Sequence, residues 1–213
     1  MGHTAFLIVD MQNDFCLPGA PFEVKGAMEV AKKIREALQA CRKHGLYVAH
    51  VFRYYRPDGS DVEITRYDKF VQVGGALIEG TKGGEIVDEL KPIEGEYLIC
   101  KKRWSAFFQT ELDNLLKRLG VDQVVVTGVQ TPNCIRGTVW DANSLDYEVI
   151  VLTDGTGASS PEVHEANLND MKNIGIKLMT VEEFIKSLPN PPKDDLVEKI
   201  RNNVLKAKLE SRT

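Results

Sequence analysis

Three residues with reactive side chains each follow a short apolar run of the kind that forms buried strands. They are Asp10, Lys101 and Cys134. A thiol becomes a good nucleophile where a nearby ammonium and the amino end of a helix favour the thiolate, and where a carboxylate can take up its proton. The residues therefore predict covalent catalysis, with Cys134 attacking a carbonyl, Asp10 as the base and Lys101 as the supporting cation. Backbone amides from Gln130 to Cys134 are candidates to hold the oxyanion.

The elements that would position these groups alternate along the chain. Apolar β-rich runs predict strands, and apolar residues at helical spacing between capping residues predict helices. The predicted strands are residues 4–9, 46–52, 96–100, 123–127, 148–152 and 176–179. The predicted helices are residues 27–44, 84–90, 110–119, 135–143 and 161–173, followed by a closing helix that begins at a capping box of Thr180 and Glu183.

Several predicted strands are continuous apolar runs, as expected when helices cover both faces of a sheet. Alternating strands and helices are typical of an α/β fold, here a doubly wound, Rossmann-like and mostly parallel sheet of about six strands flanked by helices on both faces. Ligands of such a sheet bind beyond the carboxyl ends of its strands. If the first and fourth strands are neighbours, Asp10, Lys101 and Cys134 meet there.

Each of the four cysteines could have a structural role instead of a catalytic one, because an isolated cysteine is usually a small buried apolar residue. Cys41 fits that description on the apolar face of a predicted helix. Cys100 fits it in a strand, although its neighbour Lys101 makes it the reserve nucleophile, and Cys16 stays undecided. Cys134 is favoured because it is predicted to lie at the start of a helix beside two other reactive groups.

The composition argues against several classes of protein. The 27 basic and 31 acidic side chains give a formal net charge of −4, without the clustered basic surface of a nucleic-acid-binding protein. No apolar run approaches the roughly 20 residues that span a bilayer, and the run at residues 6–9 ends in Asp10 rather than forming a signal peptide. The cysteines form no CxxC pair, so we expect reduced thiols and a cytoplasmic protein.

Three short motifs occur in order along the chain. They are DMQNDF at residues 10–15, KKRWSAFFQT at residues 101–110 and GVQTPNCI at residues 128–135, with Asp141-Ala142 further on. They resemble the patterns D-x-Q-x-D-F, K-x-R-x-S-A-F-x-x-T and G-V-x-T-x-x-C-V of the isochorismatase-like cysteine hydrolases, a family that includes nicotinamidase-related amidohydrolases. The resemblance extends over roughly residues 4–158.

The resemblance implies a Cys-Asp-Lys triad, a covalent acyl-enzyme and the loss of ammonia or an amine. Its alignment gives the catalytic role to Lys101 rather than Lys102. It also implies a cis peptide bond before Gln130 that shapes the oxyanion hole, and assembly into a homo-oligomer, a dimer or a tetramer.

Two departures from the family pattern narrow the chemistry. Nicotinamidases usually carry a D-x-H metal site after the second strand, but residues 53–59 read RYYRPDG and the four histidines are scattered. We therefore expect no metal and no cofactor. Isochorismatases that cleave a vinyl ether generally lack the cysteine, so Cys134 favours amide chemistry on ureido acids, half-amides, biuret-like compounds or carbamoyl amino acids.

Four residues are candidates for substrate contact. Arg53 and Arg56 follow the second predicted strand and could hold a substrate carboxylate by bidentate hydrogen bonds. Phe15 and Phe107 could line the pocket, because aromatic residues just past a catalytic strand end commonly do so. The segment 54–84 is expected to supply loop walls.

Two domains of unequal size are expected. Residues 1–188 would form the isochorismatase-like hydrolase domain, and residues 189–213 a charged, helical C-terminal extension with an apolar stripe. We predict a cysteine-dependent amidohydrolase of a small polar molecule, without a nucleic-acid or membrane partner. Two alternatives stay open: a vinyl ether hydrolase that needs no thiol, and a non-catalytic binding protein that has kept the fold.

Overall fold

The fold is built on a six-stranded parallel sheet. The computed structural model describes residues 3–210, and its strands are β1 (His3–Val9), β2 (Tyr47–Arg53), β3 (Tyr97–Lys101), β4 (Val121–Val129), β5 (Glu148–Gly157) and β6 (Lys177–Met179). Their order in the sheet is β3-β2-β1-β4-β5-β6, and each neighbouring pair is parallel.

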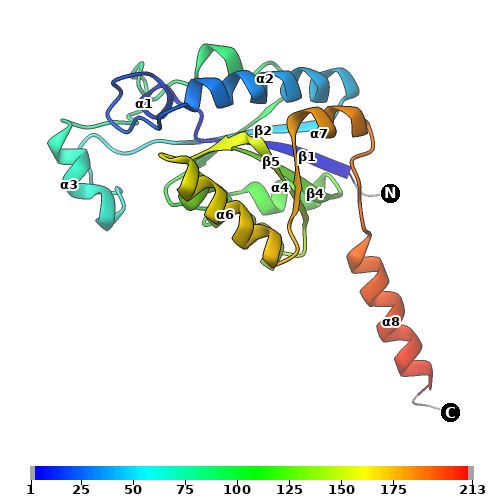
Figure 1. The fold of residues 1–213 in the computed structure, drawn as a ribbon. Helices are drawn as coiled ribbons and strands as arrows, with labels where there is room; N and C mark the ends of the chain where they lie inside the picture. Colours follow the sequence, from blue (N-terminus) through cyan, green and yellow to red (C-terminus); the bar gives the residue numbers. More distant parts are fainter. Residues whose placement is uncertain (1–2, 211–213) are drawn as a thin grey trace.

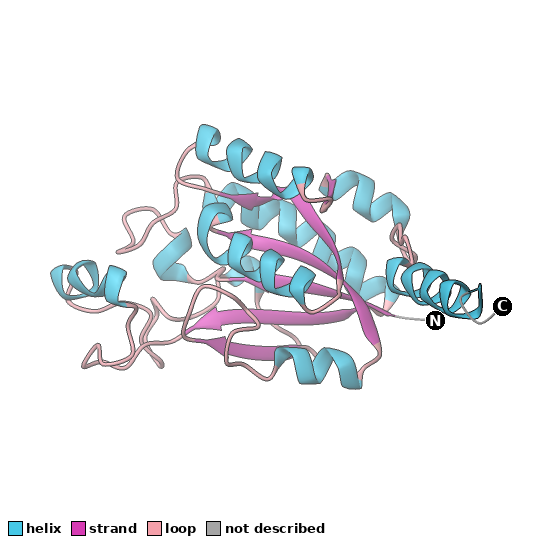
Figure 2. Ribbon diagram, turned by 90° about the horizontal axis from the view of Figure 1, so that it is seen from below, coloured by secondary structure: helices cyan, strands magenta, loops and turns pink. Residues whose placement is uncertain are grey.

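Helices cover both faces of this sheet (Figure 1 and Figure 2). On one face lie α2 (Ala27–His44) and α7 (Val181–Ser187), and on the other lie α4 (Leu112–Arg118), α5 (Arg136–Ser144) and α6 (Pro161–Asn173). Alternate residues of β1 point to opposite faces, so Phe6 and Ile8 belong to one hydrophobic cluster and Leu7 and Val9 to the other. The predicted doubly wound α/β architecture is confirmed.

The strand order reverses direction between β1 and β4. From β1 the chain moves outward to β2 and β3, and from β4 it moves outward on the other side to β5 and β6. Helices from the two halves diverge at this point, which leaves a crevice beyond the carboxyl ends of β1 and β4. The expectation that the first and fourth strands are neighbours is therefore confirmed.

Two parts of the region between β2 and β3 differ from the prediction. Residues 84–90 contain only a 3₁₀ turn, η1 (Asp88–Leu90), because the backbone before it pairs with the chain after β1: Gln12 and Ile86 form a bridge, and the Val87 N–H donates to the Met11 carbonyl at 3.0 Å. The segment expected as a loop contains a helix, α3 (Ile64–Gln72), which lies beyond the end of the sheet (Figure 1).

The C-terminal part of the chain forms a helix, α8 (Leu196–Glu210), that projects away from the rest of the molecule (Figure 1). The residues before it are tied to the sheet, since Gln123 Nε2 donates to the Pro192 carbonyl at 2.9 Å. Apolar side chains of α8 such as Ile200 and Val204 are exposed. None of the helices within residues 3–210 has the length and apolar character needed to cross a bilayer.

Candidate active site

The backbone brings three strand ends together. Asp10 directly follows β1, Lys101 is the last residue of β3, and Cys134 lies in a π-helical turn, η2 (Thr131–Ile135), that joins β4 to α5. The predicted helix at residues 135–143 therefore starts four residues after the first helical residue, Thr131, because this turn precedes the regular helix. Single π-helical turns are frequent at functional sites.

The close approach of β1 and β4 depends on Gly128. Its φ of 117° lies in the left-handed region, and a Cβ added there would stand 2.0 Å from the Val9 carbonyl oxygen. Asp10 itself has a φ of 55°, which aspartate adopts more readily than most residues, and its N–H donates to the Val51 carbonyl at 2.8 Å. These contacts hold the Asp10 carboxylate at the switch point.

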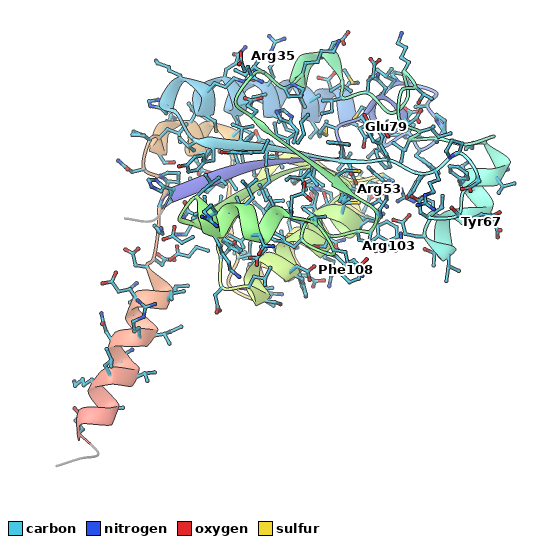
Figure 3. All side chains as sticks on the ribbon, turned by 180° about the vertical axis from the view of Figure 1, so that it is seen from behind. Arg35, Arg53, Tyr67, Glu79, Arg103 and Phe108 are labelled. Carbon is cyan, nitrogen blue, oxygen red and sulfur yellow. The ribbon has the colours of Figure 1, made fainter. Side chains whose placement is uncertain are left out.

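Four functional groups meet in one buried cluster. Lys101 Nζ lies 2.7 Å from Asp10 Oδ2, and Arg53 Nη2 lies 3.3 Å from Cys134 Sγ and 3.8 Å from Asp10 Oδ2. None of the four residues exposes more than 2% of its surface. Figure 3 shows Arg53 at the end of the sheet, between the body of the fold and the helix that carries Tyr67. The cluster joins one thiol, one carboxylate and two cations.

The charges in this cluster stabilise one another. Burial by itself raises the pKa of Asp10, but the neighbouring charges of Lys101 and Arg53 outweigh it and hold the pKa below its usual value. Burial lowers the pKa of Lys101, and Asp10 opposes this effect. The pKa of Arg53 is raised despite its burial, because Cys134 and Asp10 both favour its charged form. The aspartate is therefore ionised and the guanidinium charged at neutral pH.

The Arg53 guanidinium also makes hydrogen bonds and an ion pair with protein groups other than Cys134 and Asp10. Its Nη1 donates to the Tyr55 hydroxyl at 2.8 Å and pairs with the buried carboxylate of Glu63, while Nη2 donates to the Arg103 carbonyl at 2.9 Å. Both Nη atoms are thus engaged by protein groups. The structure places Arg53 against the thiol instead of in a position to clamp a substrate carboxylate with a free guanidinium.

Two polar residues of the first motif hold the surrounding backbone. Gln12 Nε2 donates to the carbonyls of Arg53 and Gly84 at 2.9 and 2.8 Å, and its Oε1 accepts from the Arg53 N–H at 2.7 Å. Asp14 Oδ2 accepts from the Leu77 N–H at 2.6 Å. These side chains fasten the end of β2 and the loop before η1 to the chain that follows Asp10.

The turn before Cys134 is wound around the carbonyl of Gln130. This oxygen accepts from the N–H groups of Asn133 and Ile135, both at 3.1 Å. The peptide bond between Val129 and Gln130 is cis, as the family resemblance implies. Thr131 Oγ1 lies 2.8 Å from Nδ1 of His164, a contact between the turn and α6 that the sequence did not suggest.

Two clefts lie near the cluster, and Trp104, whose ring lies close to Arg53, lines both of them. One, of about 460 Å³, is lined by Phe15, Phe22, Arg66, Trp104 and Gln130 among others. The other, of about 600 Å³, is lined by Trp104, Phe108, Asn133 and Trp140 among others. We take the first cleft as the candidate substrate site, because Gln130 lies on its wall and Arg66 touches residues that contact Arg53.

Of the predicted substrate contacts, Phe107 and Arg56 do not line the first cleft. Phe15 lines the first cleft. Phe107 instead packs against Tyr147 in the core, with ring centroids 5.6 Å apart, because its neighbour Phe108 takes the outward position. Arg56 is exposed after the strand end, and its N–H donates to Asp61 Oδ1.

Across residues 3–210, no group of three or more His, Cys, Asp or Glu residues is arranged to hold a metal ion.

Comparison with known proteins places this geometry in a class. The family model described as the isochorismatase domain matches residues 4–183. The ureidoacrylate amidohydrolase RutB of Stutzerimonas stutzeri is 32% identical over 212 residues, covering 89% of this chain and 84% of that protein. A protein of Arabidopsis thaliana named "Probable inactive nicotinamidase" is 45% identical over 189 residues, covering 87% of this chain and 96% of its own.

Solved structures agree with these relatives. The crystal structure of an isochorismatase family protein from Desulfovibrio vulgaris superposes with a TM-score of 0.84 at 47% sequence identity, covering 88% of this chain and 99% of that one. The class defined by this fold and its relatives is that of hydrolases acting on carbon–nitrogen bonds other than peptide bonds. The chain belongs to the isochorismatase family.

Proposed function

We propose that this protein is a cysteine-dependent amidohydrolase that cleaves an amide or ureido C–N bond of a small polar substrate and releases ammonia. The observation that carries the proposal is the contact between Arg53 Nη2 and Cys134 Sγ, beside the ion pair of Lys101 and Asp10. Cations adjacent to a thiol favour the thiolate, which is the nucleophilic form.

In the proposed reaction, Asp10 takes the Cys134 proton and the sulfur attacks the substrate carbonyl. The oxyanion is held by the backbone N–H groups of Gln130 and Cys134. The C–N bond breaks as Asp10 returns the proton to the departing nitrogen, so ammonia leaves and a thioester remains, or a thiocarbamate where the substrate is a ureido compound. Water, deprotonated by Asp10, then attacks the thioester and restores the thiol. Lys101 keeps Asp10 oriented through each proton transfer.

A second candidate, a non-catalytic binding protein, is favoured by the name of the Arabidopsis relative, which calls that protein inactive. The two candidates differ in what the buried cluster does. A binding protein has no need of a charged thiol, whereas the amidohydrolase depends on it. The two candidates therefore predict different effects of removing the sulfur of Cys134.

The test is ammonia release by the full chain from ureido acids, half-amides, carbamoyl amino acids, biuret and nicotinamide. Cys134→Ala should abolish release, and Cys100→Ala, which removes the thiol beside Lys101, should retain it. Equal release by wild type and Cys134→Ala would show that another group is the nucleophile. If the wild type releases ammonia from none of these substrates and a thiol reagent does not label Cys134 selectively, the binding protein would be favoured.

A further inference from the structure

The cleft beside the buried cluster contains an arginine that has no acidic partner. Arg66, on α3, is half-buried, and no carboxylate of the described residues lies within ion-pair distance of it. Among the described residues, the hydrogen bond of its guanidinium is a long one, from Nη1 to the Tyr55 hydroxyl at 3.4 Å. A guanidinium carries five N–H donors in a planar fork, so most of this donor capacity is open to the cleft.

Aromatic rings hold the Arg66 guanidinium in place. Its Cζ lies 4.9 Å from the ring centroid of Trp104, 5.1 Å from that of Phe22 and 5.6 Å from that of Phe15. Such rings attract a cation and shield it from water without neutralising its charge. The cation is thus oriented in advance and partly desolvated, and an anion that reaches it gains more than it would at an open surface.

Arg66 is also linked to the thiol by a short series of contacts. Tyr55 OH accepts from both Arg66 and Arg53, and the Trp104 ring has both guanidinium groups close to it, with Arg53 Cζ 5.6 Å from the centroid. Arg53 in turn touches Cys134 Sγ. Arg66 is therefore joined to the sulfur through two intervening side chains, Arg53 and either Tyr55 or Trp104.

Charge on the rim of the cleft favours an anion. Lys69 lies on the rim one turn along α3 from Arg66. The acidic residue that lines the cleft is Glu23, and its Oε2 accepts from the Gly19 N–H at 2.9 Å. The arginine and the lysine therefore outweigh the single carboxylate.

We infer that Arg66 binds the carboxylate of an acidic substrate by bidentate hydrogen bonds, so that the substrates are ureido acids, carbamoyl amino acids or half-amides of dicarboxylic acids. This inference rests on the proposed function, and it names the substrate class of the same site. It gives the role once expected of Arg53 and Arg56 to a third arginine. Neutral compounds such as biuret and nicotinamide should be poor substrates, because they leave the Arg66 guanidinium without a partner.

The kinetic test compares two acids with their uncharged esters. Ammonia release is measured from maleamate and N-carbamoylglycine and from the methyl ester of each. Arg66→Gln should raise KM for the acids about 10- to 100-fold and leave the esters within about twofold, as expected for the loss of one charge-assisted bidentate contact. Arg66→Lys, which keeps the charge but loses the planar fork, should fall between the two. Equal losses for acid and ester would mean that Arg66 only supports the cleft, and would overturn the inference.

The matched control is Arg35→Gln, the same change on α2. Arg35 is exposed on the far side of that helix, well away from Arg53 (Figure 3). Its effect on acids and esters should be equal and small. A loss for the acids as large as that of Arg66→Gln would attribute the effect to net charge and overturn the inference.

A second readout does not depend on hydrolysis. Cys134 is alkylated with the anion iodoacetate and with neutral iodoacetamide, and labelling is quantified on its own peptide. Arg66→Gln should lower the iodoacetate-to-iodoacetamide rate ratio about tenfold, and an unchanged ratio would overturn the inference. If Arg66→Gln lowers this ratio but the wild type releases no ammonia from any substrate, the anion site would be supported and the proposed hydrolysis rejected.

Discussion

Arg53 Nη2 lies 3.3 Å from Cys134 Sγ, although the two residues are 81 positions apart in the sequence. Their strands are not neighbours, since β1 runs between β2 and β4. The arginine is long enough to cross the end of β1, passing the Asp10 carboxylate at 3.8 Å. The thiol therefore has a second cation beside it in addition to the lysine that the family motif supplies.

We expect Arg53→Gln to slow alkylation of Cys134 by iodoacetamide about tenfold at pH 7, because loss of the adjacent guanidinium disfavours the thiolate. Arg53→Lys keeps a charge near the sulfur and should keep more of the rate. The matched control is Arg56→Gln, which removes an exposed arginine three residues on. Equal rates in wild type and Arg53→Gln would assign Arg53 a purely structural role.

The buried pair of Asp10 and Lys101 should show strong coupling in stability. Asp10→Asn or Lys101→Met alone removes one partner of a buried ion pair and should lower the free energy of unfolding by about 3–5 kcal/mol. The double variant should cost less than the sum of the two, as measured by urea unfolding. Lys32→Met breaks the exposed pair with Glu29 and should cost under about 1 kcal/mol. Additive losses at Asp10 and Lys101 would contradict the coupling.

Gly128→Ala should destabilise the protein and distort the site, because the new Cβ would meet the Val9 carbonyl oxygen at 2.0 Å beside Asp10. The expected loss is roughly 3 kcal/mol or more, combining steric overlap with an unfavourable φ. Gly175→Ala has a φ of 91° and no atom within 4 Å of its Cβ, so it isolates the conformational cost at about 1 kcal/mol. Gly128→Ala should therefore have a lower melting temperature and release less ammonia than Gly175→Ala.

Glu96 should contribute to acid stability. Burial alone would raise the pKa of Glu96, but the bidentate pair with Arg42 and the hydrogen bonds from Ile93 N–H and His50 lower it from 4.5 to about 2. A folded pKa below the unfolded one means that this stabilisation is fully present above about pH 4.5 and is lost as the pH falls towards 2.

Urea unfolding of wild type and Glu96→Gln across this range tests the prediction. The stability difference between the two proteins should be largest near pH 7 and should shrink between pH 4.5 and about 2. A difference that stays constant with pH would show that Glu96 acts through packing alone.

Removing α8 should leave the rest of the fold intact. A chain ending at residue 195 keeps the contacts that residues 189–195 make with the sheet, including that of Pro192 with Gln123. We expect its melting temperature and ammonia release to match those of the full chain. We also expect the full chain to be a dimer or tetramer, and the shortened chain to have fewer subunits per assembly by light scattering, because α8 exposes an apolar stripe. An equal number of subunits in the two proteins would place self-association elsewhere.

Much of the architecture could be predicted because it depends on local patterns. The helix over Pro161–Asn173 and the capping box of Thr180 and Glu183 appear where the sequence predicts them. Continuous apolar runs become strands that helices cover on both faces, because a strand without a polar side cannot face water. The three motifs place Asp10, Lys101 and Cys134 at or just after strand ends, and from this the sequence predicts that they meet if the first and fourth strands are neighbours.

Tertiary structure decided what lies around these groups. The α3 helix is short and buries only Phe70, and the sequence did not reveal that it carries Arg66 to the cleft. Phe107 and Phe108 are adjacent, and the packing of Tyr147 decides which ring turns inward. Arg53 lies against the thiol because of strand order and side-chain reach. Such contacts between distant segments depend on the three-dimensional path of the chain and leave no period in the sequence.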